Sequence, residues 1–166
     1  MSNINQPHIP ELEPGQIIPA FNLAGADGMP HSPWDYKQRM HLVILLLQHS
    51  SSADERKLLQ DYARSYADFR EEQCALLAIT TDTVLVNLGT QEEMRLPFPL
   101  LSDVDGKVIA RYTPWTAETH TLAPAIVLAD RYSALYQRWI AEKPGDLPGV
   151  QDLLDSLQYL NKLCTP

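Results

Sequence analysis

The two cysteines have the most distinctive chemistry in this chain, because a thiolate can attack peroxides and disulfides. Cys74 opens the apolar run Cys74–Ile79, and free cysteine is among the most buried residue types, so core packing is favoured there. Cys164 ends a predicted helix, where the dipole raises a thiol pKa. This favours a structural or incidental role for Cys164, with an exposed thiol that forms mixed disulfides as the alternative. A Cys74–Cys164 disulfide remains open from the sequence.

The segment Ser52–Glu55 is the second candidate, because it has the spacing of a capping box. In such a box a serine at the N-cap and a glutamate three residues later bond each other's backbone N–H groups. Starting a helix explains both residues without any further function. A sharper hypothesis keeps the same geometry and gives Glu55 a permanent carboxylate at the helix N-terminus, where the dipole stabilises it.

Other constellations are weaker. His49 adjoins Ser50–Ser52, but no Gly-x-Ser-x-Gly segment and no orienting carboxylate of clear geometry accompany it, which argues against a serine hydrolase. The five histidines are scattered without His-x-x-x-His spacing, so no metal site is predicted. Glycine-rich phosphate loops are absent as well, and we expect no cofactor.

Hydrophobic patterning predicts the elements that must position these residues. Three apolar runs without alternation predict strands covered on both faces: Leu42–Leu47, Cys74–Ile79 and Pro124–Ala129. Helical spacing predicts two amphipathic helices and a weaker third one: Leu58–Phe69, Val150–Cys164 and Val84–Met94. A turn at Asp130–Ser133 would form a β-hairpin with Ala134–Trp139. This order predicts an α/β sandwich with a mixed sheet.

Length and charge limit the classes of protein further. The 166 residues suit one domain, and the proline-rich start predicts an extended arm at 1–14 before a domain at 15–166. A net charge of −8 without any Lys/Arg run argues against nucleic acid or an anionic membrane as partner. The apolar run Leu42–Leu47 is far shorter than the roughly 20 residues of a membrane span. With no visible export signal and only two cysteines, we expect a cytoplasmic protein.

Six segments, in this order, resemble the peroxiredoxins, the alkyl hydroperoxide reductase/thiol-specific antioxidant (AhpC/TSA) branch of the thioredoxin superfamily. They are Phe21–Leu23, Asp27–Gly28, Leu42–Leu47, Ala78–Asp82, Phe98–Asp103 and Ala125–Asp130. The resemblance covers about Gly15 to Trp139. It implies a thioredoxin-like (redoxin) fold, with a central mixed sheet flanked by helices. It also implies an active site at the N-terminus of the helix that follows the first central strand, where the dipole favours a thiolate.

The chain departs from the family at that active site. The family signature Pro-x-x-x-Thr/Ser-x-x-Cys, placed without gaps, falls on Gln48, Ser52 and Glu55, so its proline and its cysteine are replaced. No cysteine precedes Cys74, and the family's supporting arginine is missing from Thr121–Pro124. Pro124 stands where the family often has a cis-proline, and the resemblance leaves the Ala123–Pro124 bond open between cis and trans.

These departures predict a peroxiredoxin-like protein that is redox-inactive and acts as an interaction, assembly or regulatory module. Ser52, Glu55 and Pro124 would then surround a vacated active-site pocket, with Glu55 where a thiolate would otherwise lie. The alternative is a thiol-dependent oxidoreductase or peroxidase that uses Cys164, Cys74 or both in a non-standard arrangement. A third possibility is a small-molecule or peptide binder that uses the vacated pocket. A protein partner or a homodimer is expected.

Overall fold

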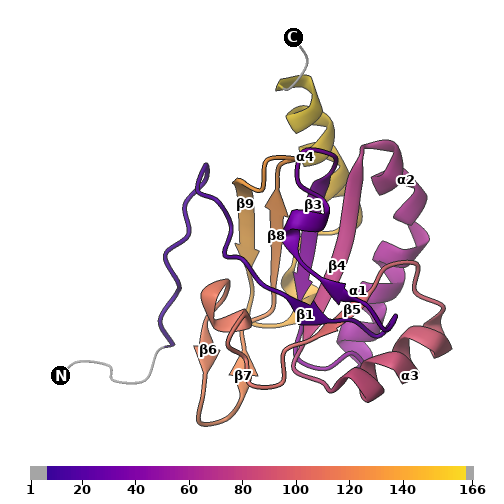
Figure 1. Ribbon diagram of the computed structural model, residues 1–166, viewed down its shortest axis with the longest axis vertical. Helices are drawn as coiled ribbons and strands as arrows, with labels where there is room; N and C mark the ends of the chain where they lie inside the picture. The colour runs from indigo at the N-terminus through magenta and orange to yellow at the C-terminus, as the bar shows by residue number, and fades with distance from the viewer. Residues whose placement is uncertain (1–6, 164–166) are drawn as a thin grey trace.

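The computed structural model describes residues 7–163, which are built around a five-stranded mixed sheet (Figure 1). Its strands lie in the order β5-β4-β3-β8-β9. The parallel strands are β3 (His41–Leu46), β4 (Cys74–Thr80) and β5 (Leu100–Ser102). The strands β8 (Ala125–Ala129) and β9 (Leu135–Ile140) join as an antiparallel hairpin, with β8 also antiparallel to β3. The three central strands and the hairpin predicted from the apolar runs are confirmed.

Four α-helices connect or flank these strands: α1 (Ala53–Arg64), α2 (Tyr66–Glu71), α3 (Val84–Met94) and α4 (Val150–Leu163). Three short 3-10 helices cover Pro33–Asp35, Ile109–Arg111 and Pro144–Asp146. Two small antiparallel pairs join β1 (Leu23–Ala24) to β2 (Pro30–His31) and β6 (Trp115–Thr116) to β7 (Thr121–Leu122). This is the mixed α/β architecture that the sequence predicts. Within residues 7–163, every helix is too short or too polar to span a lipid bilayer.

Alternation along β3 divides the core into two layers, because successive side chains of a strand point to opposite faces. Val43 and Leu45 pack on one face with buried residues of the flanking helices: Leu59, Tyr62, Phe69, Leu153 and Leu157. Leu42 and Ile44 pack on the other face with the N-terminal segment and the second 3-10 helix: Leu12, Ile18, Phe21, Ile109 and Tyr112. Both faces of the central strands are therefore covered, as their continuous apolar runs predict.

The structure differs from the sequence prediction in one helix and adds contacts to the N-terminal segment. The single helix expected over Leu58–Phe69 is interrupted at Ser65, which is the C-cap of α1 and the N-cap of α2. The N-terminal segment from residue 7 to residue 22 has no helix or strand and is mostly exposed, but Leu12, Ile18 and Phe21 pack into the core on one face of the sheet. Leu12 is buried and the Arg138 guanidinium donates a hydrogen bond to the Pro10 carbonyl at 3.0 Å.

Candidate functional site

The first turn of α1 holds Ser52 and Glu55, but the predicted capping box is wrong. Ser52 is the N-cap, yet its hydroxyl accepts no capping hydrogen bond. Its backbone N–H donates to the His49 carbonyl at 3.3 Å, so this N–H is not available to the Glu55 carboxylate. Glu55 is only 8% exposed, and the backbone N–H groups of His49 and of Glu55 itself lie near its carboxyl.

Glu55 is the residue that the gapless placement of the family signature aligns with the cysteine, and its surroundings decide its charge. Burial, the largest effect, raises the pKa of the carboxyl above its ordinary value of 4.5, and the nearby Asp54 raises it further. The two backbone N–H groups and the His49 side chain lower the pKa without reversing the shift. Burial therefore works against the permanent negative charge that the sequence hypothesis assigns to this position.

Glu55→Gln is expected to raise the free energy of unfolding at neutral pH and to change it little in acid. A raised pKa in the folded state means that Glu55 contributes stability below its unfolded pKa and loses it as the pH rises through the folded pKa. Glutamine stays neutral, so the difference in free energy of unfolding between the two proteins grows with pH from the unfolded pKa of Glu55 to its folded pKa. Urea unfolding at a series of pH values measures it.

The matched control for this prediction is Asp54→Asn, on the exposed neighbour in the same helical turn. It should lower the free energy of unfolding at neutral pH by about 0.5 kcal/mol, because it removes a charge that favours the helix N-terminus. A Glu55→Gln stability curve that runs parallel to the wild-type curve at all pH values contradicts the burial of a titrating carboxyl.

The Gln48 side chain joins the ends of three strands at the edge where the loop after β3 begins. Its Nε2 donates to the Thr81 hydroxyl at 3.1 Å and to the His120 carbonyl at 2.7 Å. Its Oε1 accepts the Leu122 backbone N–H at 2.9 Å, and the Thr81 hydroxyl donates to the Gln48 carbonyl at 2.7 Å. The proline of the family signature could form none of the bonds of this side chain. Gln48 thus fixes β7 and the end of β4 to the start of the α1 loop.

Asp82 is the central charge of this edge, and no local sequence motif marks it. One carboxylate oxygen is 2.8 Å from His49 Nδ1, and the other accepts the Ser50 backbone N–H at 2.7 Å. The Ser50 hydroxyl lies 3.1 Å from that second oxygen and 3.0 Å from the Thr90 hydroxyl. His49 and Asp82 each follow one of two neighbouring parallel strands. Neighbouring parallel strands end at the same edge of a sheet, so the positions of His49 and Asp82 directly after two such strands could have indicated their contact.

The absence of an orienting carboxylate for His49 was therefore a wrong prediction, but the cluster is not a hydrolytic triad. In a triad the histidine lies between the carboxylate and the serine, so that it can take the hydroxyl proton. Here Asp82 lies between them and bonds both partners. Ser50 is also fully buried, whereas the His49 side chain is 53% exposed. The geometry makes Asp82 a structural acceptor for the loop and leaves no activated nucleophile.

A cleft of about 360 Å³ opens beside this cluster. Its lining mixes polar and apolar surface and comes from four segments of the chain: Gln48, His49, Thr81, Val104, Thr119, His120 and Thr121. Ser52, Glu55 and Pro124 do not line it, so the predicted pocket of those three residues is not what opens here. Pro124 is buried before β8, and the Ala123–Pro124 bond is trans. Among residues 7–163, no three His, Cys, Asp or Glu side chains are grouped to hold a metal ion.

Cys74 lies at the start of β4, paired with His41 at the start of β3. The candidate edge follows the other end of these strands, roughly 20 Å away for six residues of extended chain. Cys74 is a free thiol with no exposed surface, its Sγ donates to the Ala75 carbonyl at 3.3 Å, and burial raises its pKa far above the ordinary value. The predicted packing role of Cys74 is confirmed. Cys164 and its possible disulfide lie outside the described residues.

Two sequence relatives match 106 residues of this chain. Both are putative peroxiredoxins of Mycobacterium tuberculosis, from two strains, and each is 31% identical over 106 residues. The match covers 64% of this chain and 65% of each relative, so slightly less than two thirds of their length is represented.

Solved structures show the same fold at low identity. Peroxidoxin BcpB of M. tuberculosis matches with a TM-score of 0.80 at 18% identity, over 90% of this chain and 99% of that protein. Enterococcus faecalis AhpC matches with a TM-score of 0.82 at 14% identity, over 92% and 95% of the two chains. The expected thioredoxin-like fold is therefore confirmed. The AhpC/TSA family model matches residues 14–137. This chain is accordingly a member of the AhpC/TSA family, as its peroxiredoxin-like sequence segments predicted.

Proposed function

We propose that this chain is a redox-inactive peroxiredoxin-like protein that acts by binding, as an interaction, assembly or regulatory module. One observation carries the proposal: the first turn of α1, where the family places its reactive thiol, holds the buried carboxyl of Glu55. The name of the sequence relatives points to peroxide reduction, and that chemistry needs a thiolate that a peroxide can reach. Cys74 meets neither condition, because it is fully buried and its pKa is raised.

The loop between β3 and α1 supports a binding role. Gln48 and Asp82 together give this loop hydrogen bonds to two other segments, so its shape is fixed before any ligand arrives. Preorganised surfaces bind with a smaller entropic cost than mobile ones. A second protein or a second copy of this chain, met in the cytoplasm, is the partner that we propose.

The full chain, mixed with a hydroperoxide and dithiothreitol, is expected to consume peroxide no faster than dithiothreitol alone. The physical reason is that no thiol lies at the dipole-stabilised position before α1. Peroxide loss measured over time tests this. Mass spectrometry with a sulfenic-acid trap should find no adduct on Cys74 in the folded protein.

Matched serine variants separate the outcomes. Turnover above the background rate overturns the proposal, and its loss in Cys164→Ser would establish the alternative oxidoreductase that uses Cys164. Its loss in Cys74→Ser would assign the reaction to the buried thiol. An unchanged background rate in all three proteins supports the redox-inactive function.

A further inference from the structure

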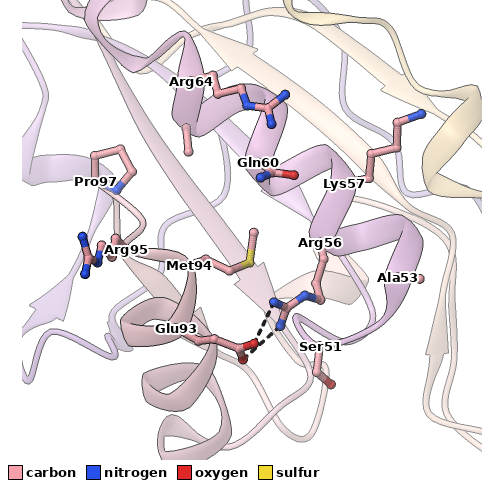
Figure 2. A pocket seen from close by; sticks show the side chains of 11 residues that line it. Ser51, Ala53, Arg56, Lys57, Gln60, Arg64, Glu93, Met94, Arg95 and Pro97 are labelled. Carbon is pink, nitrogen blue, oxygen red and sulfur yellow. Dashed lines mark hydrogen bonds and ion pairs between the residues drawn. The ribbon is translucent and has the colours of Figure 1, made fainter.

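A large groove lies between α1 and the C-terminal end of α3, and basic side chains surround it (Figure 2). Its volume is about 900 Å³. Three of these side chains come from α1: Arg56, Lys57 and Arg64. The fourth is Arg95, the C-cap residue of α3. The chain has only 13 Lys and Arg residues and a net charge of −8, so four cations around one groove are a local reversal of its overall charge.

Most of these cations have no acidic partner. Arg56 forms a two-bond ion pair with Glu93 across the groove, at 3.1 and 3.2 Å, as the dashed lines in Figure 2 show. Within residues 7–163, no ion pair or hydrogen bond engages the side chains of Lys57, Arg64 and Arg95. Clustered charges of one sign in a concave surface attract ligands of the opposite sign. The groove therefore has unpaired positive side chains that can bind an anionic ligand.

The spacing of the cations excludes a small anion as the full ligand. Arg56 and Arg64 are eight residues apart on one helix, which is about 12 Å along its axis. One carboxylate or one phosphate cannot contact both ends of this row. Alternate side chains of an extended peptide are roughly 7 Å apart on the same side, so acidic residues at positions i, i+2 and i+4 span the row. Ala63, Met94 and Pro97 add apolar surface between the charges, which suits the carbon atoms of a peptide.

We propose that this groove binds an extended acidic segment of a partner protein, with carboxylates of the segment paired to Arg56, Lys57, Arg64 and Arg95. The inference names a partner class for the binding module proposed above, and so it rests on that proposed function. Glu93 has the same charge as the ligand and holds Arg56, so it competes with the incoming carboxylates. This competition gives the proposal a substitution that should strengthen binding.

The test uses the full chain and a fluorescein-labelled peptide, Glu-Ala-Glu-Ala-Glu, with a Gln-for-Glu peptide as the uncharged control. Fluorescence anisotropy should show saturable binding of the acidic peptide alone, weakened by added salt. The double variant Lys57→Gln/Arg64→Gln should bind roughly tenfold more weakly, because it removes two exposed charge contacts. Glu93→Gln should bind more tightly. Lys143→Gln, an exposed cation outside the groove, should bind as the wild type does.

Several results would overturn the inference. They are the absence of peptide binding, equal weakening in Lys143→Gln, or no gain in Glu93→Gln. Tripolyphosphate that binds where the peptide does not would also overturn the peptide assignment. A chain that binds no peptide and turns over no peroxide loses this inference and keeps the proposed function. Peroxide turnover in a chain that binds the peptide overturns the proposed function alone.

Discussion

Asp82→Ala is expected to lower the free energy of unfolding by about 3 kcal/mol, since it removes the acceptor for a buried backbone donor. The Ser50 N–H, 2.7 Å from the carboxylate, would lose its only partner, and Ser50 has no exposed surface through which water could replace it. The His49 contact, which is half exposed, adds little to this loss. Urea-induced unfolding, followed by circular dichroism, measures the change.

Two variants serve as controls. Asp82→Asn keeps a carbonyl oxygen of the same size. Its free energy of unfolding should fall by about half as much as that of Asp82→Ala, because a neutral acceptor replaces the charged one. Asp105→Ala removes an exposed carboxylate whose ion pair with Lys107 spans 3.4 Å, and it should stay within about 0.5 kcal/mol of the wild type. If Asp82→Ala costs no more than Asp105→Ala, the loop does not depend on the buried acceptor.

Gly106→Ala is expected to lower the free energy of unfolding by about 4 kcal/mol, from two costs at one residue. Gly106 has φ = +69°, in the left-handed region that disfavours a side chain. A Cβ at this position would also overlap the indole ring of Trp115, which lies in β6. Displacing Trp115 should disturb the β6–β7 pair that carries the His120 and Leu122 contacts of Gln48.

Gly89→Ala is the matched control, because it is the same substitution in a different environment. Gly89 lies in α3, has no positive φ, and a Cβ there would meet no atom within 4 Å. Alanine should therefore stabilise the helix, by roughly 0.5–1 kcal/mol. Thermal unfolding of both variants tests the pair. Equal effects of the two substitutions would contradict the close packing of Trp115 on Gly106.

The central strands were predictable because each is a continuous apolar run that is buried on both faces. The break at Ser65 was not, because the amphipathic pattern continues through it. Tyr62 and Phe69 stack with ring centroids 5.5 Å apart, whereas seven residues of a straight helix would separate them by about 10 Å along the axis. The break therefore brings together two rings that one continuous helix would hold apart, and the local amphipathic pattern does not reveal it.

The departure from the family signature was predictable from the sequence, whereas the contacts of the β3–α1 loop were not. The missing thiol follows from the sequence alone, since no cysteine precedes Cys74. The bond partners of Gln48 lie up to 74 residues away along the chain, and those of His49 and Ser50 in the β3–α1 loop up to 40 residues away, so local spacing does not reveal them. The capping box failed for a local reason, because the His49 carbonyl accepts the Ser52 N–H that the pattern assigns to the Glu55 carboxylate.

The interior position of Cys74 has a consequence for how this protein responds to oxidative stress. Between residues 7 and 163 the chain presents oxidants with no accessible sulfhydryl, so this part of its surface keeps the same thiol chemistry before and after a burst of oxidant. A complex formed through that surface would involve no thiol, so its lifetime would depend on salt and concentration and not on the thiol redox state.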